Sequence, residues 1–491
     1  MRSWAISLMW GVSTLSVTAS LGGCASLGAG GLGPKKTQFV AELPAAPLDE
    51  ATQKQKWVEP SSDRLPTTDW VHAFNDPVLE QLITEALAAN TNVRTAAARL
   101  AAAEAGAKSS RSGLYPSLNG NTSVRRTESA DGNIPGSTSL SLGSSVSWEV
   151  DLWGRVRDTA NAGDLEAQAS NADYAGARLS IAGATAQTWF NLIEAKLLRD
   201  LAERNVATQE RALRLTKRRF DGGVSGSSDF RLARSALANA EATLAFRQLN
   251  ESAITRQLET LLRRYPENEL KSAEDLPALP LLTDAGSPSD VFLRRPDLLA
   301  AERRMQSAGL NVDISKKNLL PRITLSGNGS SSGRSFSRLF DIDSLIASVT
   351  AGLSAPIFQG GALRANVARN EAVLTQQLEA YAGTALTAYR EVENALDAET
   401  LLETREKSLQ VSLDEALKAE ERLEQRFSEG LASILQLLDA QSRRINTEGQ
   451  FISARKERLA NRVRLHLALG GGLYGQEMAR QKLPKPKLMG L

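Results

Sequence analysis

The sequence is poor in the residue types on which most enzymes and metal proteins depend. Its 491 residues include one Cys and only two His, His72 and His466, which lie far apart. One Cys excludes an intrachain disulfide framework and a Cys-rich metal site. Neither an HExxH motif nor a phosphate-binding P-loop occurs, and no His-bearing triad presents itself. We therefore expect no enzyme, no metal site and no cofactor apart from a covalent lipid.

The chain also lacks an excess of charge of one sign. Lys and Arg total 58 against 56 Asp and Glu, a formal net charge of +2, which argues against a general nucleic-acid binder. Aromatic residues make up 5%, and this scarcity favours long helices built from small side chains. Beyond the amino terminus there is no run of about 18 apolar residues, so we expect strands rather than helices to make any membrane crossing.

The amino terminus has the layout of a secretory signal. Arg2 precedes a mostly apolar stretch over residues 4–21, and the sequence Leu-Gly-Gly-Cys ends at Cys24. These four residues resemble the lipobox of bacterial lipoproteins, although Cys24 is alternatively an incidental free thiol. The resemblance implies removal of residues 1–23 and a diacylglycerol and N-acyl lipid, such as palmitate, on Cys24. Residues 24–68 are rich in Gly and Pro, which favours an extended tether.

The body of the chain contains the same layout twice. Three motifs recur with a constant difference in residue number: Tyr-Ala-Gly, Arg-Phe, and the Gly that precedes each long helical run. Tyr174 and Tyr381 begin the two copies of the first motif, which gives an offset of 381 − 174 = 207. Several matches at one offset indicate an internal duplication. We place repeat 1 at residues 69–270, a Pro-rich linker at 271–289, repeat 2 at 290–472 and a C-terminal tail at 473–491.

Long helices are predicted in both repeats. An Ala-rich helical run over residues 76–114 opens with Asp76 and Pro77, a favourable N-cap and first-turn pair. The Pro-free runs over residues 155–220 and 362–427 follow the predicted strands. At 1.5 Å per residue, each of these would be roughly 100 Å long.

Two β-hairpins with Gly, Asn and Ser tips are predicted at about residues 117–152 and 322–357, where apolar and polar residues alternate. Their strands are long enough to cross a bilayer, which needs about 9 to 11 tilted residues. A sheet in hydrocarbon must close on itself, and four strands cannot close. Several chains must therefore share one barrel, and three would supply twelve strands. A soluble β-sandwich is the alternative.

Several motifs are spread over nearly the whole mature chain. They are the lipobox at Cys24, WVHAFNDPVL at 70–79, SWEVDLWGR at 147–155, LRRPD at 293–297, Arg-Phe followed by Gly at 219–223 and 426–430, and LLDAQ at 437–441. With these motifs the sequence resembles the TolC-type outer-membrane factors, specifically the NodT-like lipoproteins of RND efflux systems. The resemblance implies a mainly α-helical fold with membrane β-strands. It further implies a homotrimer in which a long α-barrel continues a twelve-stranded outer-membrane β-barrel, four strands per chain.

The resemblance also implies a function and partners. The protein would be the outer-membrane exit duct of a tripartite efflux pump in a Gram-negative bacterium. It would be lipid-anchored in the outer membrane, with its α-barrel in the periplasm, and would receive substrates from an inner-membrane RND transporter and a periplasmic adaptor. Two alternatives remain open: the outer-membrane channel of a type I protein secretion system, and a lipid-anchored helical surface scaffold without channel activity.

Two turns follow the longest predicted helices. In each turn a Gly ends the helix, a common device that requires no binding partner. By resemblance these turns form the periplasmic tip on which the adaptor docks, and an apolar residue beside a small one suits such docking. The predicted docking residues are Gly223, Val224, Ser225, Gly430, Leu431 and Ala432.

The resemblance places a ring of acidic residues at the periplasmic aperture. Asp439 corresponds to this ring, although by itself an Asp on a helix is most often a solvated charge. Three carboxylates around a narrow pore would attract cations or basic partners. The family's second acidic position is Gln436 here, which leaves one ring where some relatives have two. The repeat 1 counterpart of Gln436 is Asp229, which is also expected at the aperture.

Overall fold

The computed structural model describes residues 70–128, 136–282, 291 and 294–471. All of these residues belong to one compact unit, which spans Leu43–Leu491. The predicted signal, the tether with Cys24, part of the linker and the C-terminal tail lie outside the described residues. The predicted boundaries of these segments therefore stay predictions.

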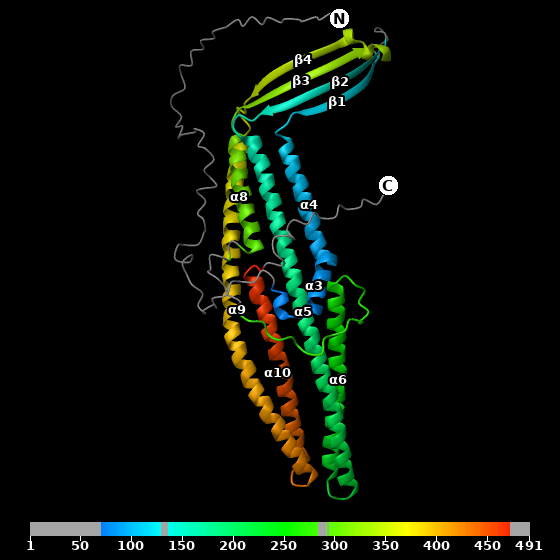
Figure 1. The fold of residues 1–491 in the computed structure, drawn as a ribbon. Helices are drawn as coiled ribbons and strands as arrows, with labels where there is room; N and C mark the ends of the chain where they lie inside the picture. Colours follow the sequence, from blue (N-terminus) through cyan, green and yellow to red (C-terminus); the bar gives the residue numbers. More distant parts are fainter. Residues whose placement is uncertain (1–69, 129–135, 283–290, 292–293, 472–491) are drawn as a thin grey trace, which may run out of the picture. The chain divides into compact units, whose positions relative to one another are not determined.

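The elements follow one another as two sets of helices and strands (Figure 1). The helices are α3 (Pro77–Ala89), α4 (Thr91–Ser112), α5 (Arg155–Asp221), α6 (Ser227–Leu261), α8 (Pro296–Lys317), α9 (Ala362–Ser428) and α10 (Ile434–Ala468). The strands are β1 (Ser117–Thr127), β2 (Ser137–Val150), β3 (Arg322–Gly333) and β4 (Leu345–Ser354). Short 3-10 helices are η1 (His72–Phe74), η2 (Phe336–Phe340) and η3 (Ile342–Ser344).

The element bounds repeat along the chain. α5 begins at Arg155 and α9 at Ala362, an offset of 362 − 155 = 207, and their last residues differ by the same number. The first and last residues of α6 and α10 also keep this offset. Upstream, α4 and α8 begin at Thr91 and Pro296, an offset of 296 − 91 = 205 that β1 and β3 share. α5 and α9 contain 67 residues each, one more than the sequence predicts. The structure thus confirms the duplicated long-helix repeat.

The helical run predicted over residues 76–114 is two helices. It is broken between α3 and α4 at Asn90, whose ψ angle of 135° is not helical. The Asn90 side chain accepts a hydrogen bond from the Asn92 N–H at 2.8 Å and donates one to the carbonyl oxygen of Leu261 at 2.9 Å. One amide therefore caps α4 and also binds the C-terminal end of α6. The prediction of one helix was wrong because this contact joins residues far apart in sequence.

Asp76 connects the start of α3 to the core. As predicted, it is the N-cap, since its carboxylate accepts hydrogen bonds from the N–H groups of Val78 and Leu79, both at 3.0 Å. The other carboxylate oxygen accepts a hydrogen bond from the indole N–H of Trp189 at 2.8 Å. Trp189 is fully buried on α5, so this bond fixes α3 against the centre of repeat 1.

α5 is the central helix of the described residues. α4, α6, α8 and α10 pack against it, and α9 packs against α8 and α10. Apolar side chains of α3, α5 and α10 meet in the main core. A second core is formed by α8, by the end of α10 and by one face of α9, which includes Tyr381, Ala385, Val392 and Leu396. Within the described ranges, no helix combines the length and the apolarity that crossing a membrane requires.

The four strands form one antiparallel sheet in the order β1-β2-β3-β4 (Figure 1). Both predicted hairpins are confirmed, and the pairing of β2 with β3 joins them. β2 and β4 end at Val150 and Ser354, so Leu152 and Ile357, which continue the predicted alternation, lie beyond them. The tip of the second hairpin is not a simple Gly, Asn and Ser turn, because η2 and η3 occupy it and Leu339 is buried there.

Candidate functional site

The turns that join α5 to α6 and α9 to α10 have the same backbone geometry. Gly223 and Gly430 adopt positive φ angles of 71° and 85°. In the first turn the Val224 N–H donates to the Arg219 carbonyl oxygen at 2.8 Å, and the second turn repeats this bond at 2.7 Å. This is the Schellman arrangement, which ends a helix and favours Gly at the left-handed position. Gly thus ends both helices, as the sequence predicts.

The predicted docking residues lie at these turns. Val224 and Leu431 are 73% and 65% exposed, so each turn presents one large apolar side chain to its surroundings. The Ser225 side chain points toward the start of α6, where its hydroxyl lies 2.8 Å from the Asp229 carboxylate. Ala432 packs against the small apolar cluster beneath the second turn. Two of the three residues predicted at each turn are therefore exposed, and the third, Ser225 or Ala432, is half-buried.

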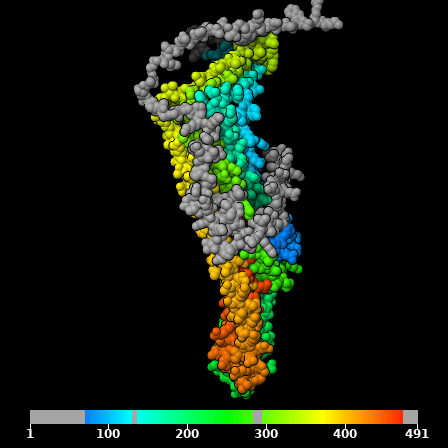
Figure 2. All heavy atoms as spheres, turned by 60° about the vertical axis from the view of Figure 1, so that its left-hand side comes forward, coloured from blue at the N-terminus to red at the C-terminus, as the bar shows by residue number. Residues whose placement is uncertain are grey.

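Arg219 connects the two turns. Its guanidinium donates a hydrogen bond to the Phe427 carbonyl oxygen at 2.7 Å and lies over the Phe427 ring, 5.0 Å from the ring centroid. In the space-filling view, the orange and red ends of α9 and α10 lie beside the green ends of α5 and α6 (Figure 2). Sequence reasoning missed this residue, although Arg219 belongs to the Arg-Phe motif that recurs in repeat 2.

The two turns differ in what lies beneath them. Phe427 is 4% exposed and packs with Ile434 and Leu437 in a small apolar cluster. Its repeat 1 counterpart, Phe220, is 39% exposed and stacks on Phe230 with ring centroids 5.8 Å apart. Phe427 is therefore part of an apolar cluster that also includes Ala233 of α6, whereas Phe220 is half-exposed and packs on a single aromatic ring.

The three predicted aperture residues lie in the first two turns of α6 and α10. Asp439 is exposed and accepts a hydrogen bond from Arg443, one helical turn later, at 2.8 Å. This bond raises the pKa of the Arg443 guanidinium. Gln436 forms a capping box with Ser433, since each side chain binds the backbone N–H of the other residue. Asp229 is bound to Ser225, so all three side chains have local partners.

The sheet has one apolar face and one polar face. The pairing register aligns Leu118, Val146 and Val349 in one row across the strands. Val150, Ile323 and Leu353 form another row on the same face. Rows of Ser, Thr and Asn lie between them and face the other side. Many of the apolar side chains are exposed, so the described helices leave this face uncovered.

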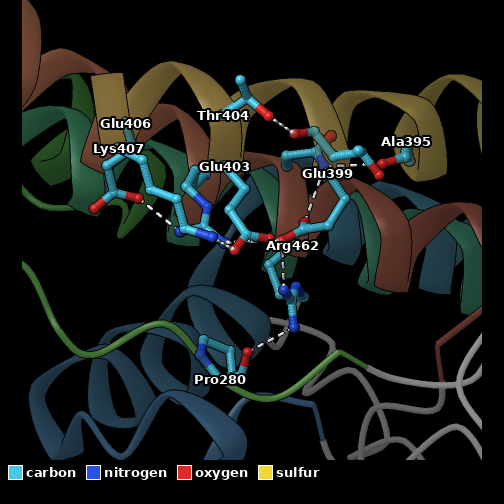
Figure 3. Close-up of polar contacts among 11 residues, drawn as sticks. Pro280, Ala395, Glu399, Glu403, Thr404, Glu406, Lys407 and Arg462 are labelled. Atoms are coloured by element: carbon cyan, nitrogen blue, oxygen red, sulfur yellow. Dashed lines mark hydrogen bonds and ion pairs between the residues drawn. The ribbon is translucent and has the colours of Figure 1, made fainter. Parts of the chain in front are cut away.

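A buried ionic cluster holds the linker against repeat 2 (Figure 3). Arg462 on α10 is 2% exposed and donates to the Glu399 carboxylate at 2.7 Å and to the Pro280 carbonyl oxygen at 2.5 Å. Glu399 also accepts hydrogen bonds from Asn461 at 3.3 Å and Arg458 at 3.5 Å. These bonds fix the linker to the α9–α10 pair. No group of three or more His, Cys, Asp or Glu side chains among the described residues is placed to hold a metal ion.

Comparisons with known proteins agree with this architecture. The family model described as outer membrane efflux protein matches residues 82–262 and 287–471, one match for each repeat. The pyoverdine export outer membrane protein OpmQ of Pseudomonas putida is 29% identical over 460 residues, which cover 90% of this chain and 97% of OpmQ. Outer membrane protein OprJ of Pseudomonas aeruginosa is 29% identical over 482 residues, which cover 94% of this chain and 96% of OprJ.

A solved structure has the same fold. The outer-membrane channel OprN superposes with a TM-score of 0.78 at 27% identity, over 87% of this chain and 99% of that chain. The family match covers well over half of the sequence, and these relatives match over nearly their full lengths. The chain therefore belongs to the outer membrane efflux protein family, and it is a passive outer-membrane channel of an efflux pump rather than an enzyme.

Proposed function

We propose that three copies of this chain close into one conduit, with a twelve-stranded β-barrel in the outer membrane and an α-barrel below it. The observation that carries this proposal is the sheet, whose outer strands β1 and β4 each have one edge without a partner among the described strands. Unpaired backbone groups in hydrocarbon cost several kcal/mol each, so β1 of one copy must pair with β4 of another. The uncovered apolar face suits lipid, and the polar face suits a water-filled lumen.

Conductance tests this proposal. Protein purified from the outer-membrane fraction should form trimers that conduct ions across a planar lipid bilayer. Trimers that bind the membrane without conducting would favour the surface scaffold. A monomer recovered from the soluble fraction would contradict the channel altogether.

We further propose that the conduit is fed by a periplasmic adaptor and an inner-membrane RND transporter. Support comes from the exposed apolar residues Val224 and Leu431 at two equivalent turns, which offer an adaptor repeated contacts around the ring. The relatives named as efflux and export proteins are compatible with such a pump. An ABC transporter and its adaptor, as in type I protein secretion, would be the other partners for the same turns.

Cross-linking tests the docking site. A photoreactive residue at position 224 or 431 should capture an adaptor in whole cells, and mass spectrometry of the product distinguishes RND-type from ABC-type adaptors. The same probe at Tyr265, which is exposed outside the turns, is the control. Equal capture from Tyr265 and from the turns would contradict docking at the turns.

We propose that Asp439 lines the periplasmic aperture, with Asp229 and Gln436 near it. Three Asp439 carboxylates facing one another would attract cations, while each Arg443 partner would offset part of that charge. Asp439→Ala should therefore weaken cation block of the conductance, and Arg443→Ala should strengthen it. If neither change alters cation block, Asp439 lies outside the aperture.

We propose that Cys24, after removal of residues 1–23, carries a diacylglyceryl thioether and an N-acyl chain. The Leu-Gly-Gly-Cys sequence supports this proposal. Mass spectrometry of the mature protein should give an amino-terminal peptide that begins at Cys24 and carries the mass of the lipid. Cys24→Ser should remove both the lipid and the cleavage. An unmodified thiol at residue 24 would contradict lipidation.

A further inference from the structure

The internal repeat identifies the surfaces by which copies would meet. Within the chain, the two repeats contact each other through α5 with α8, through β2 with β3, and through α5 with α10. The contact between α5 and α10 is the one that defines the surface described below. Because α9 is the equivalent of α5 and α6 is the equivalent of α10, a ring of repeats needs the same contact between α9 of one copy and α6 of the next. This step rests on the trimer proposed above. Each residue of the second contact then follows from the constant offset between the repeats.

The contact within the chain includes an ion pair. Lys456 on α10 binds Glu194 on α5 at 3.2 Å, and the two side chains are 17% and 16% exposed. Nearby, Gly449 of α10 lies against Leu198 and Leu201 of α5. These residues show which faces of the two helices meet.

The positions equivalent to this ion pair are apolar. The counterpart of Glu194 is Leu401 on α9, and the counterpart of Lys456 is Leu249 on α6. Leu401 and Leu249 are 61% and 66% exposed, although their counterparts are largely buried. Val411, ten residues further along α9, is exposed as well. Exposed apolar residues at positions whose repeat equivalents are largely buried indicate a surface that another copy covers.

Leu249 belongs to a longer stripe on α6. The stripe follows heptad spacing and all of its members are exposed: Leu232, Ser235, Asn239, Ala242, Phe246 and Leu249. Of the equivalent residues of α10, Gly449 and Lys456 pack on α5, whereas Asp439, Ser442 and Asn446 are exposed. The C-terminal half of the stripe, which ends at Leu249, is thus the repeat 1 copy of a surface that is already covered in repeat 2.

We propose that Leu249 of one copy packs against Leu401 of the next copy. The contact between copies is then apolar at the point where the contact within a chain is ionic. This difference also specifies the order of repeats around the ring. Two adjacent copies of repeat 1 would place Glu194 against Leu249, and two adjacent copies of repeat 2 would place Leu401 against Lys456. Only a ring in which repeat 1 and repeat 2 alternate pairs Glu194 with Lys456 and Leu401 with Leu249.

Disulfide trapping between two singly substituted chains tests the proposal. Cells that produce both the Leu249→Cys and the Leu401→Cys chains can form this disulfide only between copies. Oxidation should give a two-chain product that neither chain gives alone. The matched control replaces Leu401→Cys by Leu417→Cys, because Leu417 is also an exposed Leu on α9 but lies about 24 Å further along the helix.

The outcomes separate this proposal from the trimer itself. If the control pair is trapped as efficiently as the proposed pair while the particle is still a trimer, the Leu249–Leu401 contact is wrong and the trimer stands. If no oligomer forms with the unsubstituted chain, the trimer fails and this contact fails with it.

A charge transplant gives a second test. Leu401→Glu alone should place a carboxylate against Leu249 and lower the trimer fraction in mild detergent several-fold. The double variant Leu249→Lys/Leu401→Glu recreates across the contact the ion pair that exists within the chain, and should restore the trimer. A double variant no better assembled than Leu401→Glu would overturn the proposal.

Discussion

The two repeats share one geometry but carry opposite charges at equivalent positions. In repeat 1, Arg199 on α5 binds Glu251 on α6 at 2.9 Å. In repeat 2, Glu406 on α9 binds Arg458 on α10 at 2.7 Å. The residues correspond at the offset that relates the repeats, so the same bond is made with its charges exchanged. The Glu251 carboxylate accepts a hydrogen bond from Arg199 and thereby raises the pKa of the Arg199 guanidinium.

The neighbouring bond within the long helix is inverted as well. Lys196 and Asp200 on α5 are 3.3 Å apart, and their counterparts on α9 are Glu403 and Lys407, which are 2.5 Å apart. At four positions, the residue of repeat 1 and its equivalent in repeat 2 therefore carry opposite charges, and both ion pairs are present in each repeat. Each change of sign on one residue is matched by the opposite change on its partner.

This inversion specifies which helices pair. α6 and α10 contain 35 residues each, so length alone does not decide which of them returns along α5 and which along α9. An exchange of the two would place Arg199 opposite Arg458 and Glu251 opposite Glu406. Like charges across the pair are repulsive, so the correct pairing is favoured by the electrostatic difference as well as by the short connecting turns.

The largest expected effect concerns the buried ionic cluster, whose central carboxylate is replaced by an apolar side chain in repeat 1. The repeat 1 counterpart of Glu399 is the buried Leu192. Arg462→Met should lower the free energy of unfolding by about 3–5 kcal/mol, because it removes the 2.7 Å partner of a buried carboxylate. Adding Glu399→Leu should recover most of this loss.

Denaturant unfolding followed by circular dichroism at one fixed protein concentration measures both variants. If Arg462→Met alone leaves the midpoint unchanged, the cluster does not hold the linker and the long helices together.

The second prediction compares equivalent positions occupied by different titratable groups. Burial, with Arg462 nearby, lowers the pKa of His466 to about 4. Its repeat 1 counterpart is Glu259, where burial opposes ionisation but hydrogen bonds from the N–H groups of residues 268–270 hold the pKa below its usual value. In the folded chain, His466 is thus neutral above a pH of about 4, whereas Glu259 favours its ionised form.

Between pH 6.5 and about 4, the unfolded chain binds a proton at His466 that the folded chain does not. Stability should therefore fall by up to about 3 kcal/mol as the pH drops through this window. His466→Gln should remove that part of the decline, as measured by melting temperature against pH. The Glu259 contribution is lost only at lower pH, as that carboxylate becomes protonated. Identical slopes for both proteins would contradict the assignment.

The inverted charges predict a smaller effect. Arg199→Glu places two carboxylates together in repeat 1 and should cost about 1–2 kcal/mol, since both side chains are partly buried. Adding Glu251→Arg copies the arrangement of repeat 2 and should restore most of the stability. A double-mutant cycle measures the coupling. Additive losses would mean that the inversion does not contribute to pairing.

The smallest expected effect compares the two turns. Ala at either Gly223 or Gly430 should cost about 1 kcal/mol, because both positions have a positive φ angle. The loss should be greater at Gly430, where a Cβ would lie 3.2 Å from Arg219, than at Gly223, where nothing lies within 4 Å. Local hydrogen exchange at the two turns reports the difference. Equal losses would show that the bond from Arg219 adds nothing to the second turn.

The sequence predicts what depends on local pattern. The bounds of α5 and α9 follow from Pro-free runs that begin after one Gly and end near another. The strands follow from the alternation of apolar and polar residues. The ion pair between Asp439 and Arg443 could also have been predicted, since oppositely charged residues four apart face each other on a helix. Local spacing was sufficient in each of these cases.

The contacts that the sequence does not predict join distant residues. Asn90 breaks a helical run by binding Leu261, and Arg462 binds Pro280, 182 residues away. Arg219 binds Phe427 across 208 residues. No local pattern encodes these partners, because each depends on which helices the duplication brings side by side. The duplication therefore predicts the framework, and the tertiary contacts within it appear only in the structure.

Counting chains in the particle tests the central claim most directly. Native mass spectrometry of the complex, released in mild detergent from outer membranes, measures that number. We predict three chains per particle, since two repeats per chain and four strands per chain then close both barrels. A particle of one or two chains would contradict the account, because β1 and β4 would keep unpaired edges in the membrane.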